Sequence, residues 1–290
     1  MSQLVCENIA KQYKKKEVLH DINLTIEQGK IYGLVGRNGA GKTTLLSIMT
    51  AQNPATAGTV TLDGMPVWEN QKALDHLCFS RELNTLSVLG PNTIKVKEYL
   101  QMARTYYPNW DREMEKRLVA QFELNPKKKI SKLSKGMLSM VTIIVALASK
   151  ADITILDEPV AGLDVVARDD FYRLLLEEHE ATGRTFIVST HIIEEAANVF
   201  EEVIFLKDGD ILLKENTQDL LDRAVHVSGL AEEVDNACAG LEIHHVEQMG
   251  RSKGVTVLLN DGEQIPDGYD VTVQPVSLQN LFVALCGREA

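Results

Sequence analysis

The sequence predicts an α/β fold built on a buried parallel sheet. A glycine-rich loop at residues 36–44 joins an apolar run, residues 31–35, to a stretch with helical apolar spacing. Two other apolar runs, residues 153–156 and 185–190, are followed at once by charged or imidazole side chains. Strands buried on both faces read as continuous apolar residues, and ligands bind where the carboxyl ends of such strands meet. These three segments therefore predict one ligand site at that edge of the sheet.

Length and charge set the broad class of protein. The chain has 290 residues, of which 44% are apolar, enough for one large α/β domain and a small addition. Lys and Arg number 30 against 41 Asp and Glu, which gives a formal net charge of −11. This charge argues against general attraction to nucleic acids or acidic membranes, so we expect no nucleic-acid partner.

Cysteine spacing and hydropathy indicate the compartment. The four cysteines stand far apart without a Cys-x-x-Cys pair, which predicts free thiols in a reducing cytoplasm. No secretory signal is evident. The longest apolar stretch, residues 141–148, is far shorter than the roughly 20 residues that cross a bilayer. Any membrane role should therefore be peripheral.

The residues before the glycine-rich loop should form short strands. We expect strands at residues 4–6 and 21–26, separated by a basic stretch at residues 11–16. Tyr13 stands alone among these charges. It is either a solvated surface tyrosine or, because it lies shortly before the loop, a flat surface on which a nucleotide base stacks.

The loop itself has the pattern Gly-x4-Gly-Lys-Thr of a phosphate-binding loop. Its glycines let backbone N–H groups approach phosphate oxygens, and a helix beginning at Lys42 adds the positive end of its dipole. Lys42 should reach the β and γ phosphates, Thr43 should ligate Mg²⁺, and Thr44 should contact the α phosphate. The predicted nucleotide-binding residues of the loop are Gly36, Asn38, Gly39, Ala40, Gly41, Lys42, Thr43 and Thr44.

The middle of the chain alternates short strands with helices. Short strands are expected at residues 59–62 and 77–79, and a helical insertion over residues 92–125. Ser134 and Gly136 precede an apolar helix, where their local pattern indicates no more than ordinary helix capping.

The two later apolar strands end in the strongest catalytic candidates. Asp157 should hold Mg²⁺ or its water, and Glu158 should orient and deprotonate an attacking water. His191 either donates to a γ phosphate or serves as a structural hydrogen-bonding group. A hairpin over residues 203–213 should follow.

Residues 222–290 are expected to form a small α/β appendage. His244 and His245 have no further metal ligand at suitable spacing, so we interpret them as structural. We expect strands at residues 225–227 and 271–273, helices at residues 231–239 and 277–285, and a hairpin at residues 250–254.

Together these motifs, in this order, resemble the nucleotide-binding subunits of ATP-binding-cassette (ABC) transporters. The resemblance covers about residues 2–220. Tyr13 is similar to the family's adenine-stacking aromatic residue, and residues 36–44 are similar to its Walker A loop. Asp157 and Glu158 resemble the Walker B aspartate and the catalytic glutamate. The remaining matches are the signature motif at residues 133–137, the D-loop at residues 161–164 and the switch histidine at His191.

The resemblance implies a P-loop NTPase fold with a RecA-like core, an antiparallel β subdomain and an α-helical subdomain over about residues 83–150. It places the ABC ATPase domain at residues 1–221 and a C-terminal accessory domain at residues 222–290. It also implies ATP and Mg²⁺ as cofactors, ATPase activity, and a cytoplasmic position on the inner face of the cell membrane.

In this family two subunits pair head to tail, so that each ATP lies between the Walker loop of one subunit and the signature motif of the other. The expected partners are a second ABC subunit, in a homodimer or a heterodimer, and a separate integral-membrane permease. By resemblance, Ser134 and Gly136 contact the γ phosphate bound by the other subunit, and Asp164 connects the two sites. Lys42 and His191 stabilise charge on the transferring phosphoryl group while Glu158 aligns the water.

The signature motif departs from the common family pattern. It reads Leu-Ser-Lys-Gly-Met, so that Lys135 and Met137 replace the usual glycine and glutamine. Val165 stands where a proline commonly follows the D-loop aspartate, a change that we expect to be minor.

The family's Q-loop glutamine is also absent after residue 79. Glu82 is the first candidate for its place, with Ser80 and Arg81 as alternatives. A carboxylate there would bind Mg²⁺ directly or through water but would repel the γ phosphate, so we expect altered coupling rather than loss of activity.

The signature motif and the stretch Tyr-Pro-Asn-Trp-Asp at residues 107–111 look most like the bacterial exporter branch linked to GntR-type regulators. The sequence thus predicts the ATP-hydrolysing subunit of an exporter. Residues 83–110 would form the surface that binds the permease; alternatively, their aromatic residues are in ordinary packing.

The second hypothesis is a soluble ABC-type ATPase switch that is not coupled to transport. A P-loop kinase or GTPase is disfavoured by the signature motif, and a cassette that barely hydrolyses ATP is disfavoured by Glu158 and His191.

Overall fold

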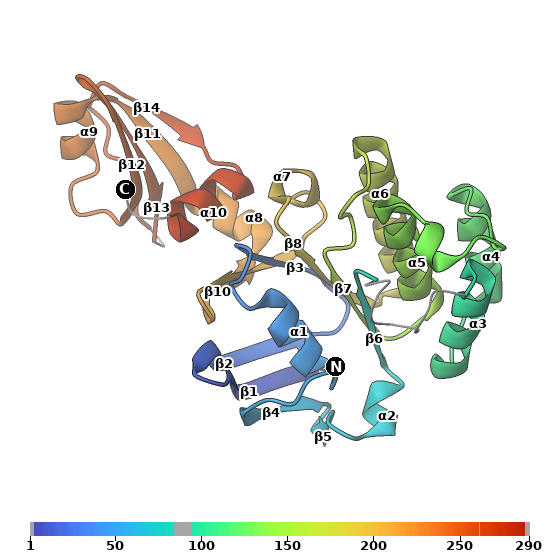
Figure 1. The fold of residues 1–290 in the computed structure, drawn as a ribbon. Coiled ribbons are helices and arrows are strands. Elements are labelled where there is room, and N and C mark those ends of the chain that lie inside the picture. The colour runs from blue at the N-terminus through green and yellow to red at the C-terminus, as the bar shows by residue number, and fades with distance from the viewer. Residues whose placement is uncertain (1–2, 84–93, 261, 288–290) are drawn as a thin grey trace.

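Three sheets organise the part of the chain that the computed structural model describes, namely residues 3–83, 94–260 and 262–287 (Figure 1). The first has the strand order β2-β1-β4-β5, and the second has the order β10-β9-β3-β8-β7-β6. The third, with the order β12-β13-β11-β14, is formed by the C-terminal part of the chain.

The first sheet is antiparallel, and its strands are longer than the sequence predicted. The predicted break at residues 11–16 is wrong, because both strands continue into this basic stretch and only residues 14 and 15 form the turn. The first strand pairs with a neighbour on each side, which gives its backbone groups hydrogen-bond partners despite the charged sequence. The strands are β1 (Gln3–Tyr13), β2 (Lys16–Glu27), β4 (Ala57–Leu62) and β5 (Met65–Pro66).

The central sheet contains the predicted buried strands and is parallel except at one edge. There β9 and β10 form the predicted antiparallel hairpin. Because β3, β7 and β8 are parallel neighbours, their carboxyl ends meet at one edge of the sheet. The strands are β3 (Ile31–Gly36), β6 (Leu77–Arg81), β7 (Ile153–Asp157), β8 (Thr185–Thr190), β9 (Glu202–Lys207) and β10 (Asp210–Asn216).

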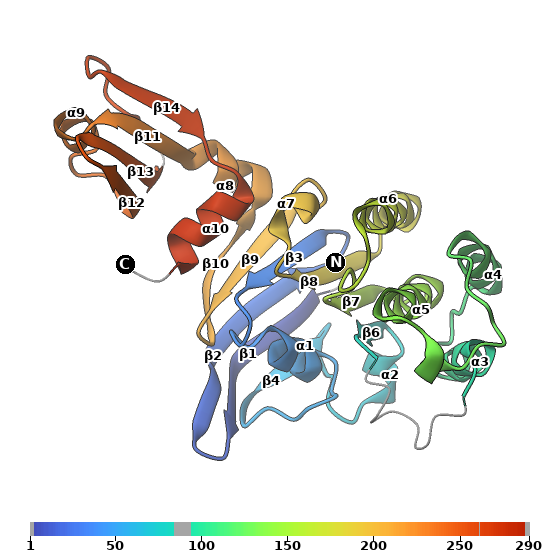
Figure 2. The same cartoon turned by 45° about the horizontal axis from the view of Figure 1, so that its top comes forward.

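Apolar cores form on both faces of the central sheet. On one face, α1 (Lys42–Met49) is enclosed between the central and the first sheet (Figures 1 and 2). On the other face the larger core is covered by helices. These are α3 (Val96–Tyr106), α4 (Arg112–Gln121), α5 (Lys135–Ala148), α6 (Val165–Thr182) and α7 (Ile193–Ala196).

The predicted helical insertion over residues 92–125 corresponds to α3 and α4, although residues 92 and 93 lie outside the described residues. The side chain of Asp111 begins α4 by accepting hydrogen bonds from two backbone N–H groups of its first turn. There are two further short elements: α2 (Gln71–Leu74) precedes β6, and a 3₁₀ turn, Ile130–Lys132, precedes α5.

The C-terminal part has a small core of its own but also returns to the main one. Valines of β11 and β13 pack against α9. The ring of Phe282 in α10 meets Phe205 of the central sheet edge-on, with centroids 5.3 Å apart. The elements are α8 (Thr217–Arg223), β11 (Ala224–Leu230), α9 (Ala231–Ala237), β12 (Ile243–Met249), β13 (Ser252–Leu258), β14 (Val271–Pro275) and α10 (Leu278–Cys286).

The predicted domain boundary between residues 221 and 222 falls within α8 and stays a prediction. Among the described residues, no helix combines the length and the apolar character that a membrane span needs.

Candidate nucleotide-binding and catalytic site

The phosphate-binding loop connects the end of β3 to the start of α1. Gly36 ends the strand, Gly41 is the N-cap, and Lys42 is the first helical residue, as predicted. Gly39 and Gly41 have φ angles of 87° and 109°, in the left-handed region that other residues rarely adopt. A Cβ atom at Gly41 would also lie 2.8 Å from Leu19 Cδ2. The loop conformation therefore requires glycine at these positions.

Lys42 is held between this loop and the acidic end of β7. Its side chain is buried, and its Nζ donates to the carbonyl oxygen of Gly36 at 2.6 Å. The same Nζ lies 3.5 Å from Oε1 of Glu158. The other predicted loop residues surround it, with Asn38 and Gly39 exposed, Ala40 buried, and Thr43 and Thr44 in the first turn of α1.

Asp157 ends β7 and binds hydroxyl groups from two other elements. Thr43 donates its hydroxyl to Oδ2 of Asp157 at 2.7 Å. Ser189, in β8, donates its hydroxyl to Oδ1 of Asp157 at 2.5 Å. The sequence analysis missed Ser189, whose only signal is its place two residues before His191 on a buried strand.

Glu158 sits on a strained turn directly after the strand. Its φ angle is 51°, a left-handed conformation that costs a non-glycine residue about 1–3 kcal/mol. Its N–H donates to the backbone oxygen of Ser189 at 3.1 Å and to the hydroxyl of Ser189 at 3.0 Å, so β8 holds the turn in place. Nδ1 of His191 lies 2.7 Å from Oε2 of Glu158. The hydrogen bonds to β8 thus hold this strained turn, and the turn places the carboxylate of Glu158 between Lys42 and His191.

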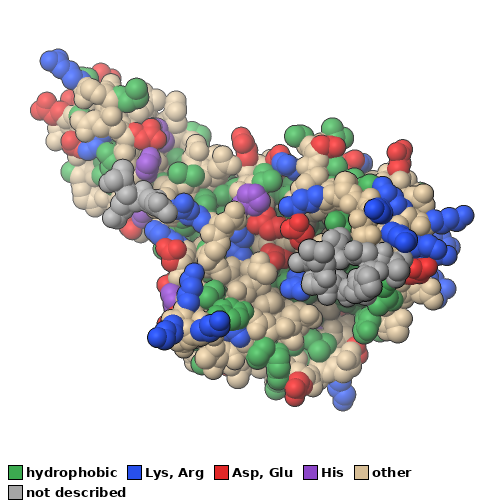
Figure 3. All heavy atoms as spheres, in the orientation of Figure 1, with side chains coloured by type: hydrophobic (Ala, Val, Ile, Leu, Met, Phe, Trp, Pro, Cys, Tyr) green, Lys and Arg blue, Asp and Glu red, His purple; other side chains and the backbone are tan. Residues whose placement is uncertain are grey.

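The structure brings Lys42, Thr43, Asp157, Glu158 and His191 together at one edge of the central sheet. Figure 3 shows acidic side chains and a histidine gathered in a hollow over the ends of β7 and β8. The buried ammonium of Lys42 suits a phosphate. The carboxylate of Glu158 can accept a proton from water, and the imidazole of His191 can donate to a phosphate oxygen.

The oxygen donors in this cluster fit Mg²⁺. The hydroxyl of Thr43 and the carboxylate of Asp157 are ligands of the kind that Mg²⁺ prefers, and their 2.7 Å separation suits neighbouring positions on one ion. Bound Mg²⁺ would neutralise charge on the β and γ phosphates.

Tyr13 ends β1 and contacts a different set of residues. Its side chain is 46% exposed, and its hydroxyl accepts a hydrogen bond from Nδ2 of Asn53. Nζ of Lys11 lies 4.9 Å from the centroid of its ring.

The signature and D-loop residues lie together at the start of two helices. The hydroxyl of Ser134 caps α5 and the carboxylate of Asp164 caps α6, each accepting from a backbone N–H three residues later. A Cβ atom at Gly136 would lie 2.6 Å from the carbonyl oxygen of Gly162, so only glycine allows the two motifs to pack so closely.

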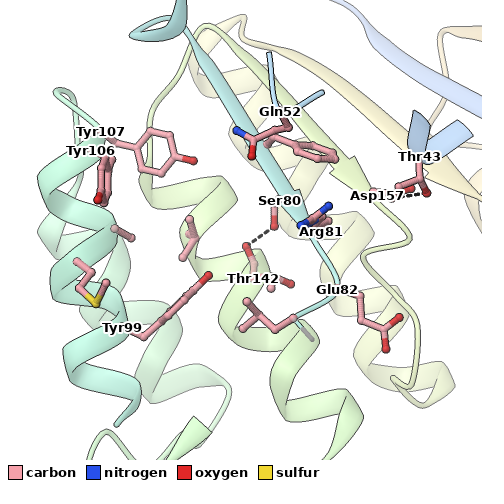
Figure 4. A pocket seen from close by; sticks show the side chains of 15 residues that line it. Thr43, Gln52, Ser80, Arg81, Glu82, Tyr99, Tyr106, Tyr107, Thr142 and Asp157 are labelled. Carbon is pink, nitrogen blue, oxygen red and sulfur yellow. Dashed lines mark hydrogen bonds between the residues drawn. The ribbon is translucent and has the colours of Figure 1, made fainter. Parts of the chain in front are cut away.

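Glu82, the predicted Q-loop substitute, pairs with the signature lysine. Its Oε1 lies 3.3 Å from Nζ of Lys135, and both side chains are more than half exposed. Figure 4 shows the carboxylate of Glu82 directed away from Thr43 and Asp157. Its binding to Mg²⁺ stays a prediction that would need this side chain to turn.

The two alternatives for the Q-loop position have other contacts. The hydroxyl of Ser80 donates to the carbonyl oxygen of Thr142 at 2.8 Å and is buried. Arg81 lies opposite Asp157 in the register of β6 and β7.

A cavity of about 610 Å³ is lined by residues of β6, α3 and α5 and extends to Thr43 and Asp157 (Figure 4). Tyr99 and Tyr107 line its helical side. Burial raises the pKa of Tyr99 to about 12 and raises the pKa of Tyr107 as well, so both phenols are neutral at physiological pH. The cavity thus joins an aromatic wall to the acidic end of β7.

Comparisons with known proteins show which family this chain resembles. A family model described as ABC transporter matches residues 19–161. The ABC transporter ATP-binding protein YtrB of Bacillus subtilis (strain 168) is 25% identical over 285 residues, which cover 96% of each chain. An uncharacterised ABC transporter ATP-binding protein of Methanocaldococcus jannaschii is 31% identical over 232 residues, which cover 77% of this chain and 81% of the relative.

An exporter subunit and a solved cassette are also similar. The Nod factor export ATP-binding protein I of Sinorhizobium fredii is 27% identical over 299 residues, covering 97% of this chain and 85% of the relative. The dimeric structure of an ATP-binding cassette in a post-hydrolysis state, bound to ADP and phosphate, is similar with a TM-score of 0.64 and 24% identity. It covers 74% of this chain and 98% of that chain, and it shows a common fold.

Proposed function

The chain belongs to the ABC transporter family as an ATP-binding ATPase subunit, and from this premise we propose that it drives export through a separate membrane permease. The convergence of Lys42, Thr43, Asp157, Glu158 and His191 carries the proposal. These groups lie at or shortly after the carboxyl ends of three different strands of the central sheet.

Each group has a proposed role in hydrolysis. Lys42 and His191 bind the γ phosphate, and Thr43 and Asp157 hold Mg²⁺. Glu158 orients water in line with the phosphoryl group and accepts its proton. The other residues of the loop, 36–44, bind the remaining phosphates, and Tyr13 stacks on the adenine base.

A second ABC subunit completes each site in this proposal. Ser134 and Gly136 contact the γ phosphate held by the other subunit, and Asp164 links the two sites. Their position at two helix starts supports this role, because N–H groups and the helix dipole favour an anion there. Hydrolysis then opens the dimer, whether its two subunits are identical or different.

The permease is proposed to bind beside the cavity between β6 and α3. The neutral aromatic wall of Tyr99 and Tyr107 suits an apolar helix end, and the cavity continues to Asp157. Export as the direction, a GntR-linked setting and a position on the inner face of the membrane rest on the sequence resemblance and on the name of the exporter relative. Residues 222–290 are proposed as an accessory domain attached to the ATPase domain at residues 1–221.

Co-purification from native membranes tests this function. Membranes of the source cell are solubilised gently, the tagged chain is captured, and the captured proteins are identified by mass spectrometry. A multi-spanning protein in stoichiometric amount is the expected result. Recovery from the soluble fraction alone, with ribosomal or nucleic-acid partners, would instead support a soluble switch.

A further inference from the structure

We propose that Lys11 is a positioning residue for the nucleotide base, because it covers one face of the Tyr13 ring and leaves the opposite face for adenine. The inference rests on the proposed ATP site and adds to it a residue outside the family motifs. It assigns recognition of the base to Tyr13 and Lys11, and recognition of the phosphates to the loop at residues 36–44.

A closed group of contacts fixes the ring of Tyr13. Nζ of Lys11 lies 4.9 Å from the ring centroid and donates to Oδ1 of Asn53 at 2.9 Å. Nδ2 of the same asparagine donates to the hydroxyl of Tyr13. The carbonyl oxygen of Pro54 accepts a further hydrogen bond from Lys11. The lysine therefore fixes one face of the ring, and the asparagine fixes its hydroxyl.

The burial of Lys11 distinguishes it from its neighbours. Its side chain is 7% exposed, whereas Lys14, Lys15 and Lys16 are exposed at the tip of the same hairpin, where Figure 3 shows basic side chains. Lysine is rarely buried without polar partners. Among the described residues, no carboxylate forms an ion pair with Lys11. Its charge is thus directed at the π-system of Tyr13 and at two neutral oxygens.

The register of the hairpin places this group beside the phosphate-binding loop. Lys11 lies opposite Leu19 in the pairing of β1 with β2. Leu19 in turn packs against the loop, since a Cβ atom at Gly41 would lie 2.8 Å from its Cδ2. Tyr13 follows two residues after Lys11, and the ammonium group of Lys11 lies over its ring. A base stacked on Tyr13 therefore lies within reach of a triphosphate on the loop.

The free face of the ring is the one available for stacking. Tyr13 remains 46% exposed although an ammonium group covers one face. A cation over one face draws π-electron density toward it, and the opposite face then attracts an electron-rich purine more strongly. Lys11 therefore orients Tyr13 and also strengthens its stacking.

The test compares two ligands that differ in the base. Binding of Mg-ATP and of inorganic tripolyphosphate with Mg²⁺ is measured by calorimetry for the wild-type chain and for Lys11→Met. We expect ATP affinity to fall about 3- to 10-fold and tripolyphosphate affinity to stay unchanged, because a cation–π contact affects only the ligand that stacks. The matched control is Lys15→Met, which removes the same charge from the exposed turn and should change neither affinity.

Two further variants separate positioning from folding. Lys11→Arg keeps a cation over the ring and should retain ATP affinity within about 2-fold. Lys11→Gln keeps a hydrogen-bonding group for Asn53 but loses the charge, so it should behave like Lys11→Met while its thermal unfolding midpoint stays near that of the wild type.

A double-mutant cycle with Tyr13→Ala decides whether Lys11 acts through the ring. In that background Lys11→Met should have no further effect on ATP binding. The inference is overturned if Lys11→Met and Lys11→Gln bind ATP like the wild type, if they lose affinity for both ligands equally, or if Lys11→Met loses as much ATP affinity again when Tyr13 is absent. Failure of the wild-type chain to bind either ligand would instead overturn the proposed ATP site itself.

Discussion

The two halves of the candidate site are built differently within one chain. In the hydrolytic half, side chains at or after the ends of three strands contact one another: Thr43 donates a hydrogen bond to Asp157, and His191 lies against Glu158. In the signature half, the polar atoms of Ser134 and Asp164 cap their own helices. One half is thus assembled by the central sheet, whereas the other presents helix starts to whatever lies outside the chain.

The difference teaches where the single chain is sufficient. Contacts between neighbouring strands fix the hydrolytic geometry before any partner binds, because the parallel register brings the strand ends together. A helix start becomes a phosphate site only when a phosphate approaches it from outside. We therefore expect changes in the hydrolytic half to affect chemistry or binding in the single subunit, and changes in the signature half to affect assembly.

The substitution Glu158→Gln should have the largest effect. It removes the proton acceptor but keeps the shape of the side chain beside Lys42 and His191. We expect kcat to fall about 1000-fold with ATP binding retained, and the ATP-bound dimer to accumulate because closure no longer ends in hydrolysis. Phosphate release and light scattering with size-exclusion chromatography measure the two effects. Glu180→Gln, on the exposed face of α6, is the control, and a monomeric, fully active Glu158→Gln variant would refute the assignment.

The substitution Lys42→Ala should weaken ATP binding about 100-fold, since it removes charge-assisted hydrogen bonds to two phosphates. Calorimetry with Mg-ATP measures the change, and Lys72→Ala in the exposed part of α2 serves as the control. Unchanged affinity would remove the basis for placing the phosphates on this loop.

The substitution Ser189→Ala should lower kcat about 10-fold, because it leaves an oxygen of Asp157 unpaired and frees the turn at Glu158. ATP affinity should change less than kcat. Ser149→Ala removes a similar buried hydroxyl far from the site and should lower stability alone. Equal kcat in both variants would show that the hydroxyl of Ser189 has no part in holding the carboxylates.

The same contrast explains what the sequence predicted. The phosphate-binding loop and the end of β7 were predictable because short segments carry their pattern, and the structure forms α1 at Lys42 as expected. The roles of Ser189 and Lys11 were not predictable. Their partners, Asp157 and Asn53, lie 32 and 42 residues away along the chain, and only the folded structure brings them together. The length of β1 was also missed, because pairing on both sides overrides the charged sequence.

The smallest expected effect concerns Glu82 and Lys135, the two departures from the family pattern that pair with each other. Both side chains are more than half exposed, so the ion pair should contribute at most about 1 kcal/mol to the stability of the single chain. Glu82→Gln and Lys135→Met should therefore leave its unfolding midpoint unchanged, as should the control Lys116→Met in another exposed ion pair.

The same two variants should shift ATP-dependent dimerisation by about 2- to 5-fold, since Lys135 lies at the helix start that is proposed to face the second subunit. Sedimentation of the Glu158→Gln background with ATP measures this shift, and the double variant tests whether the two effects are additive. Strict additivity would mean that the pair does not connect the Q-loop position to the signature motif. An effect on the single chain larger than that on the dimer would contradict the division into two halves, because it would make the signature half as self-contained as the hydrolytic one.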